Sequence, residues 1–141
     1  MDTLGAVVDG LYTYITTDGA LMALMGGAVE LDFLFAPQDE TVPYLQCRVT
    51  ATAVGPGDPA VQGTYSLRIW DRAGTATRVF NIRARLMAIL DGYEMYPTGA
   101  DAAEVRIAWV ADQTLEEPVP DWWCEEVTFS IRYIRAGEAR P

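Results

Sequence analysis

The sequence predicts an α+β domain, a mixed and largely antiparallel sheet with two main helices packed on one face. Four segments alternate apolar and polar residues, as half-buried strands do, and two repeat apolar residues every three or four positions, as helices do. Two helices cannot cover both faces of such a sheet, so a two-layer arrangement is the simplest solution. The 141 residues are of single-domain length. We therefore expect one domain over residues 1–141, with 136–141 as a flexible tail.

The N-terminal part predicts a helix, a short helix and a short strand. Residues 3–16 carry an apolar stripe on one helical face, formed by Leu4, Val7, Val8, Leu11 and Ile15. Thr17 and Asp18 are good N-caps for a short helix over 19–25, which Gly26-Gly27 closes. Residues 29–35 predict a strand that ends at Pro37, because proline has no N–H to donate to a neighbouring strand.

The middle of the chain predicts a hairpin with an unusually long tip. Residues 44–54 alternate most clearly, and residues 64–70 alternate again. The connection between them is rich in glycine and proline and exceeds the usual two to five residues of a hairpin loop. It consists of Gly55, Pro56, Gly57, Asp58, Pro59, Ala60, Val61, Gln62 and Gly63. Loops of this length are commonly functional, so the tip is a candidate contact for a partner.

The remaining elements are a second helix and two further strands. Residues 75–90 place Val79, Ile82, Leu86 and Ile89 on one face, leave three arginines (Arg78, Arg83 and Arg85) in water, and stop at Gly92. Residues 104–111 and 122–135 alternate as strands, separated by an acidic segment broken by two prolines.

The residue inventory excludes most catalytic chemistry. The chain has 20 acidic and 10 basic residues, no histidine, and only arginine as its basic residue. Imidazole bases, histidine metal clusters, Schiff bases and P-loops are therefore ruled out. Three carboxylate pairs are not accompanied by other residues typical of a catalytic site: Asp39-Glu40, Glu116-Glu117 and Glu125-Glu126. Cys47 and Cys124 are most simply reduced thiols. We predict no enzyme, no cofactor and no metal.

The charge and hydropathy also limit the partners. A formal net charge of -10 argues against gripping DNA, because phosphate neutralisation supplies most of that affinity. The apolar stretches are shorter than the roughly 20 residues of a membrane span, so no membrane partner is expected.

One arginine falls on each of the four best strands, on the face opposite the apolar rows. These residues are Arg48, Arg68, Arg106 and Arg132. They are either a solvated sheet surface that covers apolar area with its side-chain stems or a docking face for carboxylates of an identical or different partner. Phosphate binding is a third alternative.

Three tryptophans add to this surface. Trp122 and Trp123 are adjacent in a strand, so they face opposite sides, and Trp70 lies away from Leu67 and Ile69. Tryptophan is enriched at interface hot spots. A minor loop or the C-terminal tail is the alternative cover for these side chains.

An ordered series of features resembles the tail terminator (tail-completion) proteins of long-tailed bacteriophages and gene-transfer particles. The series is an N-terminal helix, the turn Leu21-Met22-Ala23-Leu24 with Gly26, Ala36-Pro37-Gln38 and Val42-Pro43-Tyr44, the strand Tyr65-Ser66-Leu67-Arg68-Ile69-Trp70, the helix over 76–90 with Gly92, and a strand with Phe129, Ile131 and Tyr133. It spans nearly the whole chain. The segment after Gly92 and the Trp122-Trp123 pair fit the family least.

The resemblance implies a non-catalytic subunit of a homo-oligomeric ring, expected to be a hexamer. The ring caps the tail tube protein, stops its polymerisation and joins the head-tail connector protein, while DNA passes through without specific binding. It is assembled in the host cytoplasm and resides at the head-proximal end of the virion tail. Another neck ring protein and a small-ligand-binding α+β domain are the alternatives. A finite ring is physically reasonable, because identical subunits joined head to tail form a closed ring when their successive rotations add up to a full turn.

Overall fold

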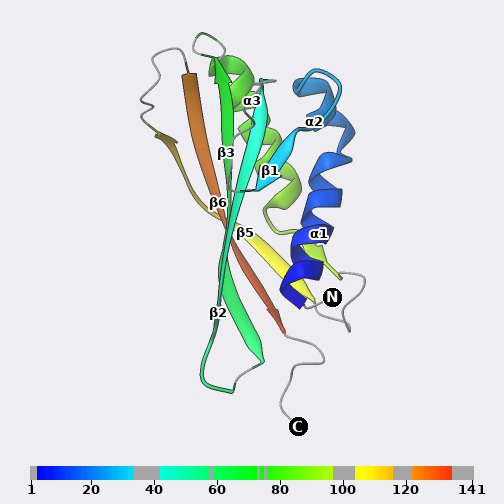
Figure 1. Cartoon of the computed structure of the whole chain (residues 1–141), viewed down its shortest axis with the longest axis vertical. Helices are drawn as coiled ribbons and strands as arrows, with labels where there is room; N and C mark the ends of the chain where they lie inside the picture. Colours follow the sequence, from blue (N-terminus) through cyan, green and yellow to red (C-terminus); the bar gives the residue numbers. More distant parts are fainter. Residues whose placement is uncertain are drawn as a thin grey trace.

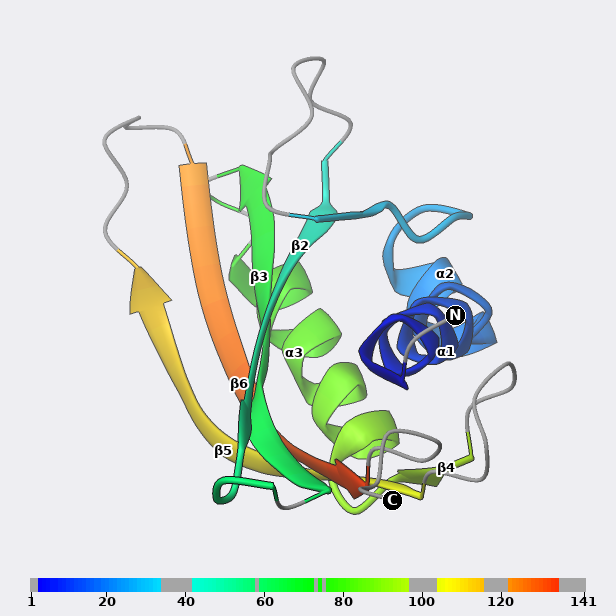
Figure 2. The same cartoon turned by 60° about the horizontal axis from the view of Figure 1, so that its bottom comes forward.

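A six-stranded sheet with all helices on one side forms the framework of the protein (Figures 1 and 2). The computed structural model describes residues 3–33, 42–57, 59–72, 74, 76–96, 104–115 and 122–134. The strand order is β1-β2-β3-β6-β5-β4, in which β1 runs parallel to β2 and all other neighbours are antiparallel. The elements are α1 (Thr3–Thr16), α2 (Gly19–Leu24), β1 (Leu31–Phe33), β2 (Tyr44–Ala53), β3 (Ala60–Arg72), α3 (Ala76–Leu90), β4 (Glu94–Met95), β5 (Val105–Leu115) and β6 (Trp122–Ile134).

The N-terminal helices follow the predicted capping pattern. The prediction for α1 is confirmed, and α2 ends at Leu24, with Met25 as its C-cap. Asp18 is the N-cap of α2, where its carboxylate accepts a hydrogen bond from the backbone N–H of Leu21 (2.9 Å). Gly26 and Gly27 follow with φ of 90° and 121°, which glycine adopts without steric cost.

Both main helices contact the sheet, α3 more extensively than α1, whose Tyr12 stacks on Phe33 of β1. α3 packs on β3, β5 and β6 through the predicted stripe, which is buried together with Leu90. The other main helix, α1, lies on the same side (Figure 2). It is fixed to the end of α3 by Tyr14, whose hydroxyl donates to the carbonyl of Ile89 (2.9 Å) and whose ring stacks on Tyr93.

The three arginines of α3 do not stay in water as predicted. Arg78 binds Asp71, Arg83 binds Asp112, and Arg85 binds Asp18. All three arginines are half-buried, because their partners stand on β3, on β5 and at the start of α2. The pairs therefore fasten α3 to the sheet on one side and to α2 on the other.

The hairpin tip is shorter than the sequence predicted. We expected a loop over residues 55–63, but Ala60, Val61, Gln62 and Gly63 belong to β3 and pair with both β2 and β6. A single small residue makes the pairing at this point possible, since a Cβ on Gly63 would lie 1.8 Å from the carbonyl oxygen of Thr50. Periodicity underestimated the strand because residues 60–63 alternate weakly.

The last two strands form the other half of the sheet. β5 extends beyond the predicted residue 111 to Leu115, with a register shift between Trp109 and Ala111, and the two-residue β4 was not foreseen. β6 matches its prediction up to Ile134, and the core fills the space between this sheet and α3. The predictions for 34–41, Asp58, 116–121 and 135–141 concern residues outside the described ranges. No described helix is long and apolar enough to cross a membrane.

Candidate assembly surface

The sheet face turned away from the helices, here called the helix-free face, carries all four predicted arginines. Arg48 stands on β2, Arg68 on β3, Arg106 on β5 and Arg132 on β6. The strand register does not align them into a single row. Arg106 lies directly opposite Arg132, whereas Arg68 lies opposite Glu126 and Arg48 lies opposite Ser66.

The centre of this face is a polar row across four strands. Gln46, Arg68, Glu126 and Gln113 follow one another in register. Arg68 donates through Nε to Glu126 Oε2 (3.0 Å), and Gln113 donates to Glu126 Oε1 (3.0 Å). Burial raises the pKa of Glu126, but these two hydrogen bonds and the charges of Arg68 and Arg48 outweigh it and hold the pKa below its usual value. Arg68 therefore already has a carboxylate partner within its own chain.

At one end of the face, two arginines lie opposite each other in the register of β5 and β6. Arg106 donates to Glu104 (2.8 Å) and lies 3.9 Å from Glu94; the hydrogen bond to Glu104 and the two charges raise the pKa of Arg106. No hydrogen bond or ion pair of Arg132 is present among the described residues. Like charges opposite each other in a sheet are unfavourable, so Arg132 is the arginine most in need of an external anion.

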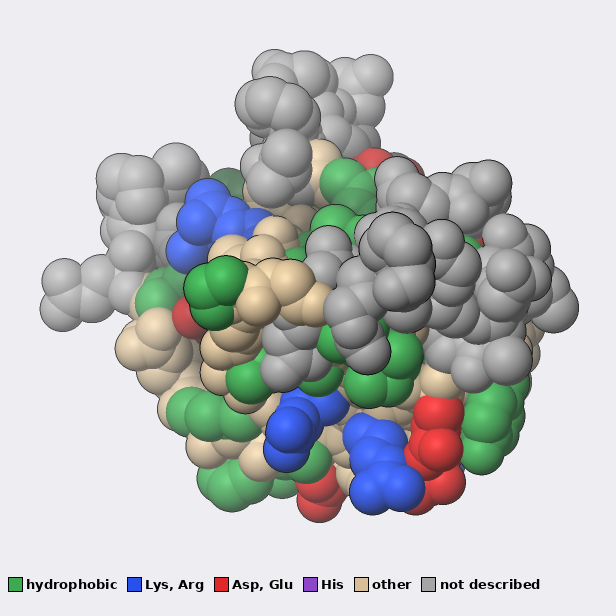
Figure 3. Space-filling model, turned by 90° about the horizontal axis from the view of Figure 1, so that it is seen from below, with side chains coloured by type: hydrophobic (Ala, Val, Ile, Leu, Met, Phe, Trp, Pro, Cys, Tyr) green, Lys and Arg blue, Asp and Glu red, His purple; other side chains and the backbone are tan. Residues whose placement is uncertain are grey.

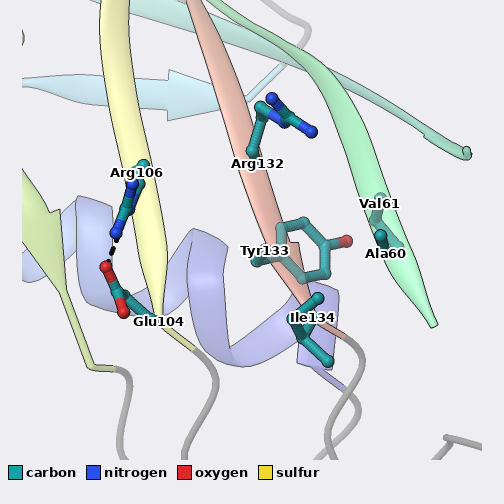
Figure 4. A pocket seen from close by; sticks show the side chains of 7 residues that line it. All are labelled: Ala60, Val61, Glu104, Arg106, Arg132, Tyr133 and Ile134. Atoms are coloured by element: carbon teal, nitrogen blue, oxygen red, sulfur yellow. Dashed lines mark hydrogen bonds and ion pairs between the residues drawn. The ribbon is translucent and has the colours of Figure 1, made fainter.

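A shallow cavity of ≈ 240 Å³ adjoins this arginine pair. Its lining is formed by Ala60, Val61, Glu104, Arg106, Arg132, Tyr133 and Ile134. Figure 4 shows Arg106 directed to Glu104, with Arg132 on the neighbouring strand. Viewed from this end, the molecule exposes blue arginine side chains, one group of them directly beside red acidic side chains (Figure 3).

The other end of the face is aromatic. The rings of Trp70, Tyr44 and Trp122 form a cluster with centroids 6.1–6.3 Å apart. The Trp70 Nε1 donates to the Gln46 side chain (3.3 Å). The guanidinium of Arg72 lies over the Trp122 ring, 4.7 Å from the centroid. Trp123 points to the opposite face, where its ring meets Phe80 of α3 at 5.9 Å. The expected separation of Trp122 from Trp123 is therefore present, and only Trp70 and Trp122 belong to the helix-free face.

Charge is segregated between the two sides of the described chain. The helix-free face holds five arginines (Arg48, Arg68, Arg72, Arg106 and Arg132) against four carboxylates (Asp32, Glu94, Glu104 and Glu126). The rest of the described residues hold three arginines, all paired on α3, against seven carboxylates. The helix-free face therefore carries a small excess of positive charge, and the other described residues carry an excess of negative charge.

The thiols show no sign of nucleophilic or metal chemistry. Cys47 and Cys124 are buried on opposite faces of the sheet and are not joined in a disulfide. Burial is the main cause that raises the pKa of Cys47 to about 11, whereas a reactive cysteine needs a lowered pKa. Among the described residues, no group of three potential ligands could hold a metal ion.

Sequence reasoning missed the partners on this face. Glu126 and Tyr44 share it with Arg68 and Trp70, and their positions in the alternating pattern were a usable signal. The pairing of Arg68 with Glu126 was not accessible, because it depends on the register between β3 and β6.

No protein-family model and no curated protein matches the chain. Its fold is similar to that of a chain in the virion of a native gene transfer agent (GTA) particle, with a TM-score of 0.73 and 14% identity over 88% of this chain and 91% of that one. A second solved structure, of a protein without a descriptive name, has a TM-score of 0.68 and 14% identity over 93% and 95% of the two chains. These likenesses show a shared fold over nearly the whole chain.

Proposed function

We propose that this protein is a structural subunit of a phage-like particle, a tail terminator that closes into a homo-oligomeric ring on the end of the tail tube. The observation that carries the proposal is the fold, which is similar to that of a chain of a gene transfer agent virion over 88% of this chain. The residue inventory agrees, since it holds no histidine or lysine for common catalytic chemistry. The ring, expected to be a hexamer, stops tube growth and joins the head connector, and DNA passes without specific binding.

In this proposal the helix-free face is a contact surface for carboxylates of other subunits of the particle, such as those stacked on the ring. Arg48 and Arg132 are exposed and have no ion pair among the described residues. Guanidinium groups bind carboxylates through paired hydrogen bonds, and the surplus of carboxylates on the rest of the chain provides such partners. Trp70 and Trp122 form the aromatic part of the same surface. Trp123 is excluded from it because it packs on Phe80.

The experiment is imaging of the purified protein with and without tail tube subunits, together with light scattering. A closed ring that caps tubes is the expected result. The variant Arg132→Glu is expected to weaken assembly, and the double variant Thr77→Glu/Asn81→Glu, which changes the charge equally on the exposed side of α3, is the matched control. Equal assembly of all three proteins contradicts the docking role of Arg132, and a monomer under all conditions contradicts the ring.

The two alternatives make different predictions for the same experiment. A neck ring protein would also form rings, but would bind connector subunits rather than cap tubes. A ligand-binding domain would remain monomeric; the cavity of ≈ 240 Å³ is smaller than the roughly 300–1,000 Å³ of usual ligand pockets. This cavity, formed by described residues, therefore gives the ligand-binding alternative no support.

A further inference from the structure

Within the described chain, half of the outer edge of β2 has no neighbouring strand. β1 pairs with β2 only as far as Cys47. The N–H of Leu45 donates outward to Glu30 (2.8 Å), whereas the N–H of Val54 donates inward to Ala60 (3.0 Å). Because backbone groups alternate along an antiparallel strand, Val49, Ala51 and Ala53 direct their N–H and C=O groups outward. No other strand of the described chain pairs with them there.

The opposite half of the other sheet edge is open as well. β4 covers Val105 and Arg106, and Ile107 exchanges hydrogen bonds with Tyr93 and Gly92 (3.0 and 2.8 Å). The N–H of Trp109 is occupied by Asp91 (2.8 Å). Beyond the register shift, the alternation directs the backbone groups of Asp112 and Thr114 outward, and no strand of the described chain pairs with them.

The β2 edge has none of the usual protection against pairing. Exposed edges are normally blunted by charges, prolines or bulges. Residues 49–53 are Val-Thr-Ala-Thr-Ala, with no charge, proline or register shift, and residues 50–53 are exposed. On β5, the positions that would pair are residues 110–114, Val-Ala-Asp-Gln-Thr, which begin at the register shift and include Asp112, whose charge is paired with Arg83. The β2 edge is therefore the unprotected one, and the charge on the β5 edge is neutralised within the chain.

We propose that the β2 edge of one copy pairs antiparallel with the β5 edge of the next, with Ala51 opposite Asp112 and Val49 opposite Thr114. This inference rests on the proposed ring and names the junction between its subunits. The strand directions fit, because β2 and β5 run in opposite directions at the two edges of the sheet. Copies related by rotation about an axis along the strands therefore meet as antiparallel neighbours.

The faces fit as well. Ala51 pairs through the sheet with Gly63, Ile131 and Ile107, whose side-chain positions belong to the helix-covered face, and Asp112 pairs with Val127 on that same face. In the junction, the side chains of Ala51 and Asp112 lie on one side of the joined sheet. All helices then stand on one side of the ring and all helix-free faces on the other.

The register fits between the ends of β1 and β4. With Ala51 opposite Asp112, residues 49–53 of one copy occupy positions 114–110 of the next. On the β5 edge, the pairing with β4 and the hydrogen bonds that flank it extend only to Trp109, just before the positions that the incoming strand would take. On the incoming copy, β1 pairs with β2 only as far as Cys47, a position just beyond the end of β5 at Leu115. The junction completes both edges without a clash between these short strands. Arg48 then comes opposite Leu115, which precedes Glu116-Glu117 in the sequence.

The offset between the open edges has the size that closure requires. Across the sheet, Ala51 of β2 is in register with Ile131 of β6. Asp112 of β5 is in register with Val127, which lies four residues away from Ile131 along β6. Each copy is therefore displaced by four residues over its four long strands. A closed sheet needs such a stagger, and one residue per strand is the ratio found in the eight-stranded barrel of shear 8, whose strands tilt by about 36°.

A two-fold pairing of β2 with β2 is the competing arrangement. It would satisfy the same backbone groups around Ala51, but it would close as a dimer and leave both β5 edges open. Only the head-to-tail junction covers both edges of every copy, and it is therefore the arrangement that the open edges favour.

Cysteine cross-linking tests this junction. The variant Thr50→Cys/Gln113→Cys places two exposed positions in a directly opposed pair without hydrogen bonds between them, where Cα atoms are about 4.5 Å apart and a disulfide can form. Mild oxidation is expected to give a ladder of covalent oligomers up to the ring size on denaturing gels. Cys47 and Cys124 are fully buried and can remain.

Two control pairs define the alternatives. Thr50→Cys/Ala108→Cys joins copies without the stagger, and Thr50→Cys/Thr52→Cys joins them by a two-fold axis; neither is expected to cross-link. A ladder or a dimer in these controls, with none in Thr50→Cys/Gln113→Cys, overturns the junction. Rings in micrographs without that ladder overturn the junction and leave the ring intact, whereas absence of both rings and ladder overturns the proposed function too.

Discussion

The arginines on the two sides of the sheet differ in how they are partnered. On the helical side, Arg78, Arg83 and Arg85 each have one carboxylate on another element of the same chain. On the helix-free face, Arg68 and Arg106 have internal partners, whereas Arg48 and Arg132 have no ion pair among the described residues. The same side chain therefore fastens elements together on one side and remains available to other subunits on the other.

The difference follows from where the carboxylates stand. Asp71 is fully buried beneath α3 and would be costly without a counter-charge. The Arg78 guanidinium supplies that counter-charge, because it donates a hydrogen bond of 2.6 Å to each carboxylate oxygen of Asp71. On the helix-free face, the surroundings of Arg132 are open to solvent, and water can satisfy its guanidinium until a partner replaces it.

The largest expected effect is on folding stability at Asp71. The variant Asp71→Ala should lower the free energy of unfolding by about 2–3 kcal/mol, below the usual cost of breaking a fully buried pair, because Arg78 can still reach water. Urea denaturation measures it. The matched control is Glu104→Ala, which removes the carboxylate partner of exposed Arg106 and should have a much smaller effect, because solvent screens an exposed ion pair. Equal losses in the two variants would remove the distinction between the two sides.

An intermediate effect is expected at Glu126, the one internal carboxylate at the centre of the helix-free face. Its pKa lies below its ordinary value of 4.5, so its stabilising contribution is complete above that pH and is lost as pH falls through the folded-state pKa. The variant Glu126→Gln should cost roughly 1 kcal/mol at neutral pH. The difference from the unmodified protein should shrink as the pH falls below 4.5 and through the lowered folded-state pKa. A difference that stays constant with pH would contradict the pairing with Arg68.

The elements with strong periodicity could be predicted from the sequence. α1, α3 and β2 have bounds close to the predicted ones, because each buries one regular face and is closed by a cap or by turn residues. The face of every predicted arginine and tryptophan was also accessible, since it needs only the alternation along one strand.

The features that depend on two strands or two layers could not be predicted. β4 has two residues and no period of its own, and its place is set by pairing with Val105 and Arg106. The carboxylate partners of Arg78, Arg83 and Arg85 come from segments up to 67 residues away. The helical periodicity places these arginines on a polar face, but it cannot show that this face contacts carboxylates of other elements. The open halves of β2 and β5 exist only because β1 and β4 are short.

The smallest effect on stability, and the most informative one for assembly, is expected at the two arginines without an ion pair. The double variant Arg48→Ala/Arg132→Ala should change the free energy of unfolding by no more than about 0.5 kcal/mol, as exposed substitutions do. Its oligomer should nevertheless dissociate at a higher protein concentration in sedimentation velocity. The unmodified ring should weaken from low salt to about 1 M salt, where the Debye length falls to about 3 Å, and the variant should lose most of that salt dependence. A variant with the assembly and salt response of the unmodified protein would assign Arg48 and Arg132 to the solvated surface and leave the edge junction as the sole subunit contact.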